Sequence, residues 1–416
     1  MTLDGFYLKC SVCGEKFDIE HQFKICPKCR GPLWIEIDDA YLEKNANFIT
    51  RPVRNMWDYL PLFPLKNNED IISLGDGGTP VIKGRLLPKL SGFEHVLFKD
   101  ETRNPTGSFK DRQTALYCNI ARQEGNLGFV TMSSGNVAVS LASHATASGL
   151  VSYELIPEWT PIEKIKLIRA YGGLPVKIKT NSSKTLYTLV ETISSKLNLY
   201  NGITAAIYSP FNVYGSKSIS YELYPYLSSV SNIFMPSGGG GGITAIYHGL
   251  QDMFKLELIK KIPRLFAVQS EGCSPIYSAW KHDLGYKEIM NSAFADCKTI
   301  ATPLADDIPL DGFSAVRAVK ETGGGVITVL DKEIINAQQM LSQNAGLFAE
   351  PAGATGFAGL IKTIATGITD RKEDSIIIVT GSGIKNLNSL KKWQRNRNMN
   401  TLRDVSKIVK NFTSLL

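Results

Sequence analysis

Short apolar segments alternate with helical patterns through the middle and the C-terminal half of the chain. Apolar runs of strand length lie at 95–99, 127–132, 151–156, 233–235, 265–269 and 375–379. Helical patterns follow at 108–124, 136–147 and 162–170. Strands that alternate with helices usually pair in parallel, so this pattern predicts an α/β protein with parallel sheets. No apolar run reaches the roughly 18 residues that a membrane-spanning helix needs, and we expect no membrane partner.

Four of the seven cysteines form two close pairs near the N-terminus, Cys10 with Cys13 and Cys26 with Cys29. Two such pairs let four thiolates converge on one tetrahedral Zn²⁺. Structural disulfides or a redox pair are the alternatives, but an odd total of cysteines and the absence of a secretory signal argue against secreted disulfides. Because four thiolates leave no open position for water or substrate, we expect a structural zinc ribbon at 1–48.

The other three cysteines, Cys118, Cys273 and Cys297, are isolated in the sequence. We interpret them as small buried hydrophobic side chains. The first residues lack a basic stretch followed by an apolar stretch, so we expect a cytoplasmic protein.

Composition and charge narrow the classes of partner. The 416 residues are 43% hydrophobic and 20% charged, which excludes a disordered protein. The net charge of +7 is concentrated at 388–416, which holds seven basic residues and one acid. Up to residue 48, acids outnumber bases by eight to six, so we expect no nucleic-acid partner. The basic tail has a helical apolar stripe at Leu402, Val405, Ile408 and Val409. We interpret it as a solvated helix, with an anionic partner or subunit contact as the alternative.

A polar motif, NPTGSFKDR at 104–112, follows the first predicted strand and opens a helix. Lys110 therefore lies in the first helical turn, where free N–H groups and the positive end of the helix dipole disfavour an ammonium. This environment suits an amine that must form a Schiff base. Taken alone, however, a lysine in a first helical turn is more commonly a solvated surface residue.

Five consecutive glycines separate the strand at 233–235 from a helix that we expect to start at Ile243. Their N–H groups have no side chains to shield them and can surround an anion at a helix N-terminus. The segment lacks the features of a P-loop or a dinucleotide site, so we predict a site for a single phosphate, with a flexible loop as the alternative. The residues of this glycine loop are Gly238, Gly239, Gly240, Gly241 and Gly242.

Two further polar turns follow predicted strands. The first turn, at 133–136, offers hydroxyls, an amide and helix N-terminal N–H groups. Together these groups suit a carboxylate, although an ordinary helix cap has the same sequence pattern. The second begins with Thr380 and lies at the carboxyl end of a buried strand, where open α/β sheets bind ligands. The first turn consists of Ser133, Ser134, Gly135 and Asn136.

Together with EPAGA at 350–354 and TGSGIK at 380–385, these motifs resemble threonine synthase and its relatives in sequence and order. The family consists of pyridoxal 5'-phosphate (PLP) enzymes with the tryptophan-synthase-β fold, fold type II, and some members carry an N-terminal zinc ribbon. The resemblance runs from about residue 57 to 386. It implies a large domain from 49–125 and 223–387 and a small mobile domain at 126–222, followed by the tail at 388–416.

The resemblance also implies a role for each motif. Lys110 would carry PLP as a Schiff base and transfer the Cα proton of the substrate. Asn136 would bind the phenolic oxygen of PLP, the glycine loop its phosphate, and Thr380 its pyridine nitrogen through a neutral hydroxyl. Such a hydroxyl suits elimination and replacement more than transamination. The substrate would be bound by Ser133, Ser134 and Gly135.

The segment that binds the substrate phosphate in threonine synthases differs in this chain. Asn212 stands where the family has an arginine, and Ala206 and Ile207 are apolar where polar residues are expected. An amide replaces a guanidinium poorly when the ligand is a dianion. We therefore expect Lys217 to supply a charge to the substrate, with a solvated helix lysine as the alternative.

The best interpretation is a carbon–oxygen lyase of amino-acid biosynthesis that converts O-phosphohomoserine to threonine and phosphate. It would remove a Cα proton and a leaving group and then add water. One alternative is a related enzyme of the cysteate synthase, diaminopropionate lyase or serine/threonine dehydratase type. A nucleic-acid-binding zinc-ribbon protein and an inactive relative are more distant alternatives. We expect a phosphorylated amino-acid substrate, and the resemblance is compatible with a homodimer.

Overall fold

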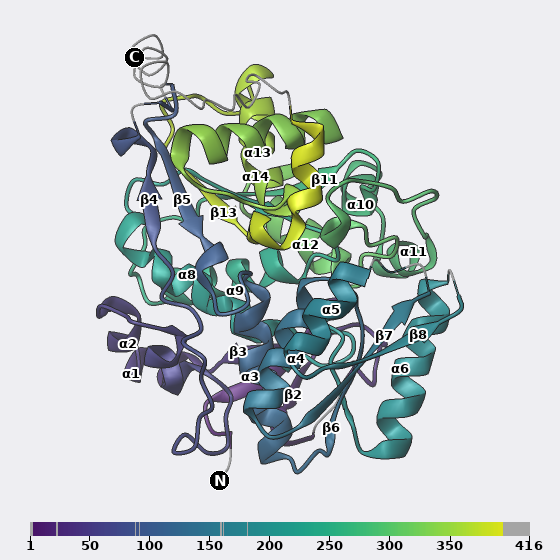
Figure 1. Ribbon diagram of the computed structural model, residues 1–416. Coiled ribbons are helices and arrows are strands. Elements are labelled where there is room, and N and C mark those ends of the chain that lie inside the picture. Colours follow the sequence, from purple (N-terminus) through teal and green to yellow (C-terminus); the bar gives the residue numbers. More distant parts are fainter. Residues whose placement is uncertain are drawn as a thin grey trace, which may run out of the picture.

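Three β-sheets organise the protein, and the largest of them combines strands from two separate parts of the chain (Figure 1). The computed structural model describes residues 3–21, 24–87, 89–90, 92–158, 160, 162–180 and 182–393. Within these residues the sheets have three, four and six strands. The two larger sheets are parallel except for one edge strand, so the predicted parallel α/β class is confirmed.

The N-terminal sheet is antiparallel and has the strand order β2-β1-β3. All five residues of β3 are buried, which marks it as the strand that faces the rest of the protein. Asp38 then caps α1 by accepting hydrogen bonds from two backbone N–H groups of the first turn. The elements of this part are β1 (Phe6–Cys10), β2 (Lys16–Asp18), β3 (Leu33–Ile37), α1 (Asp39–Lys44) and α2 (Asn47–Thr50).

The four-stranded sheet has the order β8-β7-β6-β9 and is parallel throughout. The predicted helices at 136–147 and 162–170 are observed as α4 and α5, with the predicted bounds. The elements are β6 (Gly128–Met132), α4 (Asn136–Ala147), β7 (Val151–Pro157), α5 (Ile162–Ala170), β8 (Leu174–Ile178), α6 (Ser183–Leu197) and β9 (Tyr200–Asn201).

The six-stranded sheet has the order β12-β11-β10-β13-β5-β4, and only β4 is antiparallel to its neighbour. The central strand β13 is buried at every residue, as its continuous apolar sequence predicts. The strands are β4 (Val81–Lys83), β5 (Val96–Asp100), β10 (Asn232–Pro236), β11 (Arg264–Ser270), β12 (Gly325–Val329) and β13 (Ser375–Val379). The longer helices around them are α3 (Lys110–Gln123), α9 (Gly241–Lys255), α12 (Gly312–Glu321), α13 (Asp331–Ala345) and α14 (Pro351–Ala365).

Short helices complete the described part of the chain. The short α-helices are α7 (Phe211–Tyr214), α8 (Ser218–Leu223), α10 (Pro275–Lys281) and α11 (Tyr286–Asn291). The 3₁₀ helices are η1 (Ile19–His21), η2 (Met56–Leu62), η3 (Gly84–Leu86), η4 (Glu101–Arg103), η5 (Gly215–Lys217), η6 (Tyr224–Tyr226), η7 (Thr302–Leu304) and η8 (Gly383–Lys392). None of the helices in these residues is long and apolar enough to cross a membrane.

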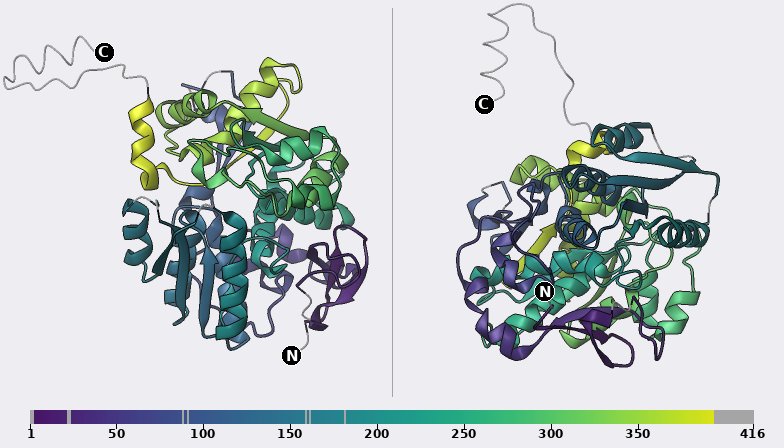
Figure 2. Two further views of the ribbon diagram at one scale, coloured as in Figure 1. Left: turned by 90° about the vertical axis from the view of Figure 1, so that its right-hand side faces the viewer. Right: turned by 90° about the horizontal axis from the view of Figure 1, so that it is seen from below.

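The three sheets occupy separate parts of the molecule. In the left view of Figure 2 the blue lobe with β6 to β8, the green and yellow lobe and the purple N-terminal sheet lie on different sides. Each sheet falls within one of the predicted domains, whose boundaries at 49–125, 126–222 and 223–387 stay predictions. The apolar stripe predicted from Leu402 to Val409 lies outside the described residues.

Candidate active site

A cavity of about 970 Å³ lies at the carboxyl ends of β6, β10 and β13 and draws its lining from both parallel sheets. This is the edge at which open α/β sheets bind ligands. The cavity collects every predicted cofactor residue and the predicted substrate turn. These lining residues are Lys110, Ser133, Ser134, Gly135, Asn136, Gly238, Gly239, Gly240, Gly241, Gly242 and Thr380.

Lys110 is the first residue of α3, and its amine faces the cavity. Nζ donates hydrogen bonds to Gln113 Oε1 at 3.0 Å and to Thr204 Oγ1 at 3.2 Å. Burial lowers the pKa of Lys110 to about 8, although the nearby Asp306 and Asp311 carboxyls raise it. A useful fraction of Lys110 is therefore the neutral amine near pH 7, which is the form that attacks a carbonyl carbon.

Backbone hydrogen bonds bring Thr380 next to the Lys110 loop. The N–H of Phe109 donates to the carbonyl oxygen of Thr380 at 3.0 Å, and the N–H of Ser382 donates to that of Gly107 at 2.8 Å. Gly107 has a φ of +79° and comes so close to Ser382 that a Cβ would lie 3.1 Å from the serine Cβ. The close pairing of these two loops requires a glycine at this position.

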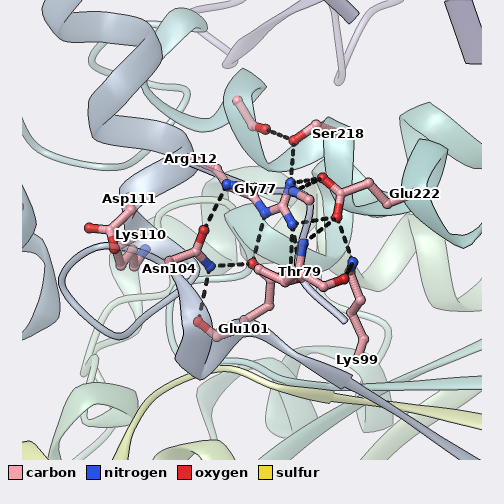
Figure 3. A network of polar contacts seen from close by, with 12 residues as sticks. Gly77, Thr79, Lys99, Glu101, Asn104, Lys110, Asp111, Arg112, Ser218 and Glu222 are labelled. Carbon is pink, nitrogen blue, oxygen red and sulfur yellow. Dashed lines mark hydrogen bonds and ion pairs between the residues drawn. The ribbon is translucent and has the colours of Figure 1, made fainter. Parts of the chain in front are cut away.

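A buried network of charged side chains holds the first turn of α3 (Figure 3). The guanidinium of Arg112 lies between the carboxylates of Glu101 and Glu222, and Glu222 also accepts a hydrogen bond from Lys99. Burial alone would raise the pKa of Glu222, but the charges of Arg112 and Lys99 outweigh it and hold the pKa at about 2. The network therefore stays ionised, and it joins the start of α3 to β5 and α8.

The glycine loop forms the start of α9, which begins at Gly241 and not at the predicted Ile243. Two carboxyls lie against this loop. A Cβ on Gly238 would lie 2.5 Å from Asp306 Oδ2, and one on Gly241 would lie 2.7 Å from Asp311 Oδ2. Burial raises the pKa of Asp306 to about 6 and that of Asp311 to about 7. Both carboxyls become neutral at mildly acidic pH, which lowers their repulsion of an anion on the loop.

Asn136 is the first residue of α4, and its side-chain amide makes hydrogen bonds to a carboxylate and to an ammonium from two distant parts of the chain. Its Oδ1 accepts a hydrogen bond from Lys385 Nζ at 2.6 Å, and its Nδ2 donates one to Glu350 Oε1 at 2.5 Å. Glu350 lines the cavity and is 4% exposed. Burial raises its pKa, while Lys385 and the Asn136 amide lower it.

The structure does not bring Lys217 to the cavity. Its side chain is 1% exposed and its Nζ lies 2.6 Å from Asp252 Oδ2, so its charge is already paired. Asn212 is also buried, with its Nδ2 donating to the carbonyl oxygens of Asn201 and Ile203. The expectation that Lys217 binds substrate therefore has no support from its position, and Asn212 holds a loop in place.

The cations that do line the cavity are lysines. Besides Lys110, they are Lys164 on α5 and the exposed Lys298, and no arginine lines the cavity within the described residues. Lys164 Nζ lies 3.4 Å from Thr302 Oγ1, which belongs to the other lobe. Sequence reasoning did not single out Lys164, Asp306 or Asp311, because none of them lies in a motif with a local chemical pattern.

The four N-terminal cysteines come together as their spacing predicts. Their sulfur atoms all lie within 4.8 Å of one another. Cys10 Sγ is 3.4 Å from Cys29 Sγ, and Cys13 Sγ is 3.7 Å from Cys26 Sγ. Four sulfurs bound to one tetrahedral Zn²⁺ at about 2.3 Å would be spaced by about 3.8 Å, so the cluster fits this metal.

The N-terminal sheet packs directly on the helix that carries the glycine loop. Trp34 of β3 stacks on His248 of α9 with ring centroids 4.9 Å apart, and it packs against Ala245 of the same helix. His248 Nδ1 also lies 3.0 Å from Glu36 Oε1. The ribbon therefore braces α9 from the side, which is a structural task and not a catalytic one.

Two of the cysteines expected to be isolated are joined. Cys273 and Cys297 form a disulfide across 24 residues, so their interpretation as separate buried hydrophobes is wrong. They meet because the N–H of Lys298 donates to the carbonyl oxygen of Gly272, which places the 292–311 loop beside the turn after β11. Cys118 is buried and free, as predicted.

Comparison with known proteins agrees with this geometry. Residues 72–381 match the family described as "Pyridoxal-phosphate dependent enzyme". The chain is 32% identical to the threonine synthase of Methanocaldococcus jannaschii, over 91% of this chain and 92% of that protein. It is 30% identical to the threonine synthase of Methanosarcina acetivorans, with the same coverage of 91% and 92%.

Solved structures show the same fold. Threonine deaminase isoform 2 from Solanum lycopersicum aligns with a TM-score of 0.66 at 19% identity, over 86% of this chain and 93% of that one. Maize serine racemase aligns with a TM-score of 0.62 at 22% identity, over 81% and 93% of the two chains. At these identities the likeness establishes the fold alone.

Proposed function

The chain belongs to the family of pyridoxal-phosphate dependent enzymes and is a threonine synthase-like lyase, and we propose that it converts O-phosphohomoserine to threonine and phosphate. The observation that carries this proposal is the position of Lys110. Its amine has a pKa of about 8 and faces the same cavity as the glycine loop and Thr380. The threonine synthases at 30–32% identity support the substrate.

The residues of the cavity fit PLP. The glycine loop opens α9 without side chains in the way, so its N–H groups would hold the cofactor phosphate. Lys110 would bind the cofactor covalently, Thr380 would face its pyridine nitrogen, and Asn136 would donate to its phenolic oxygen. When bound, PLP supplies an electron sink for the charge that develops at Cα of an amino acid.

Side chains and backbone groups of the cavity would transfer the proton and bind the substrate. Lys110, as a neutral amine, takes the proton from Cα of the substrate and later returns it. The turn Ser133–Gly135 at the start of α4 holds the α-carboxylate, because its hydroxyls meet the N-terminal N–H groups of the helix there, and the Gly135 N–H donates to Ser133 Oγ at 3.1 Å.

A specific observation favours a second candidate, an enzyme that acts by elimination or replacement on another amino acid. Asn212 is used for loop structure, and the described residues place no arginine in the cavity for a phosphate dianion. Cysteate synthase, diaminopropionate lyase and serine/threonine dehydratase chemistry belong to this candidate. They would use the same Lys110 and glycine loop and would differ in the amino-acid substrate, the leaving group or the nucleophile that is added.

Substrate turnover decides between the two candidates. The full chain with bound PLP is offered O-phosphohomoserine, O-phosphoserine, serine or threonine, and the formation of inorganic phosphate, threonine, 2-oxo acid and ammonia is measured. We expect phosphate and threonine in equal amounts from O-phosphohomoserine. Turnover of another member of the panel without turnover of O-phosphohomoserine would overturn the proposal in favour of the second candidate.

We also infer that the four-cysteine cluster holds one structural zinc ion. The support is the sulfur spacing, which fits a tetrahedral site, and the packing of the ribbon on α9. Metal analysis of the purified chain tests this inference directly. A chain that retains PLP and full stability with no bound zinc would contradict it.

A further inference from the structure

Asn136 is held between a lysine and a glutamate, and only one orientation of its amide satisfies both. Lys385 lies 2.6 Å from Oδ1, and Glu350 Oε1 lies 2.5 Å from Nδ2. A lysine ammonium has only donors and an ionised carboxylate only acceptors, so neither accepts a flipped amide. Turning the amide by 180° would place Nδ2 against the ammonium and Oδ1 against the carboxylate.

Lys385 stands behind Asn136 and not in the cavity. Asn136 and Glu350 line the cavity, whereas Lys385 belongs to η8, the yellow helix next to the grey trace in the left view of Figure 2. Gly381 leaves room for this arrangement, since a Cβ there would lie 2.3 Å from Glu350 Oε1 and 3.3 Å from Asn136 Nδ2. Lys385 therefore makes its hydrogen bond to the cavity lining through Asn136.

We propose that Lys385 is a positioning residue that fixes the Asn136 amide with Nδ2 towards the cavity, where it donates to the phenolic oxygen of the cofactor. This inference rests on the PLP site of the proposed function. Nδ2 carries two hydrogens, and Glu350 uses one of them, so the other is free to point into the cavity. Without Lys385 only the contact with Glu350 would oppose a turn of the amide, and a turned amide would present Oδ1, an acceptor, to a phenolate oxygen that repels it.

Two carboxylates and one amide, each from a different part of the chain, lie around Lys385. Burial lowers the pKa of Lys385 below its usual value, and the carboxylates of Glu350, which precedes α14, and of Asp111, the second residue of α3, only partly offset this. Within the described part of the chain, the ammonium donates its hydrogen bond to Asn136 on α4. Removing this cation also takes a positive charge away from the phenolic oxygen.

The first experiment measures cofactor binding without substrate. Lys385→Met is compared with wild type and with Lys391→Met, which removes the same charge from an exposed position of the same helix. The readouts are the dissociation constant for PLP and the pH midpoint of the visible absorption of the bound cofactor. We expect binding about tenfold weaker and a midpoint higher by about half a pH unit or more in Lys385→Met alone. If Lys385→Met had the wild-type dissociation constant for PLP and the wild-type pH midpoint, the proposal would be overturned.

A double variant tests whether Lys385 acts through Asn136. Once Asn136→Ala has removed the amide, adding Lys385→Met should change the midpoint by less than half of its effect in the wild-type background. Equal shifts in both backgrounds would overturn the proposal, because they would show a structural or purely electrostatic role. Lys385→Arg, which also has only donors, should restore the wild-type midpoint. If Lys385→Met does not fold, Lys385→Gln takes its place with the same criteria.

These outcomes are separate from those of the substrate proposal. The experiments on the Lys385 variants measure PLP binding and absorption without substrate, so their results do not depend on which amino acid the enzyme converts. If the wild-type chain bound no PLP, the proposed function itself would fail. If it bound PLP and converted O-phosphohomoserine while Lys385→Met matched Lys391→Met, only the inference about Lys385 would fail.

Discussion

Arg112 provides a quantitative test of how the protein holds Lys110 in place. Arg112 is fully buried two residues after Lys110, and its guanidinium contacts two carboxylates. Nε and Nη2 lie 2.7 and 2.8 Å from the oxygens of Glu101, and Nη1 and Nη2 lie 2.5 and 2.8 Å from those of Glu222. Lys99 Nζ lies 2.5 Å from Glu222, so two cations balance two anions.

Replacing Arg112 by methionine leaves one buried cation for two buried carboxylates. Breaking a buried ion pair by removing one partner costs about 3 to 5 kcal/mol. This is a large share of the roughly 5 to 15 kcal/mol by which native proteins are stable. Arg112→Lys keeps the charge but loses the planar fork that contacts both carboxylates, so we expect a smaller loss of about 1 to 3 kcal/mol.

Urea unfolding followed by far-ultraviolet circular dichroism measures these losses. The loss of unfolding free energy in Arg112→Met should become smaller as the pH falls from about 7 to about 5, because a buried carboxylate without its cation takes up a proton. Lys28→Met, which breaks an exposed ion pair with Glu15, should leave the midpoint unchanged. An Arg112→Met midpoint equal to that of wild type at neutral pH would refute the reasoning.

Three further predictions concern an amine, a buried carboxyl and the metal cluster. Lys110→Ala should abolish the covalent absorption band of PLP. In the wild type the rate of band formation should rise with pH through about 8, and a midpoint near 10 would contradict the burial argument. Burial raises the pKa of Glu154 to about 7, so stability should fall as the pH rises from about 4.5 to 7. Glu154→Gln should remove that fall and raise the free energy of unfolding, measured with urea at pH 8, by about 2 to 3 kcal/mol. A variant whose stability depends on pH as that of the wild type does would contradict this prediction. Cys13→Ser should lose the bound zinc in metal analysis and lower the melting temperature, and retained zinc would exclude that cysteine as a ligand.

Local sequence was sufficient for much of the scaffold. Helices α4 and α5 have the predicted bounds, because amphipathic periodicity and the preceding polar turn are encoded within a dozen residues. The apolar pattern does not predict α14, which is buried over nearly its whole surface and so shows no polar face. The start of α9 differs by two residues because glycines at 241–242 adopt helical backbone despite their low helix propensity.

For the candidate site too, local sequence predicted some of the residues and only the packing of the chain placed the others. Lys110, the glycine loop and Thr380 were recognisable because each follows a strand in a short polar motif, and parallel strands bring their carboxyl ends to one edge. Lys217 was expected to supply a charge to the substrate, with a solvated helix lysine as the alternative, and only packing shows that it pairs with Asp252 away from the cavity. Cys273 and Cys297 likewise meet through a loop contact that no spacing rule indicates.

The sequence by itself determined the parallel α/β class, the spacing that brings four cysteines together and the lysine that faces the cavity. Each of these depends on neighbours within a few residues, whose geometry backbone sterics and hydrogen bonding nearly dictate. Only the tertiary structure decided that Asp306 lies on the glycine loop and that Lys385 holds the Asn136 amide. Those contacts join residues from distant parts of the chain, and their distances depend on how whole helices and loops pack.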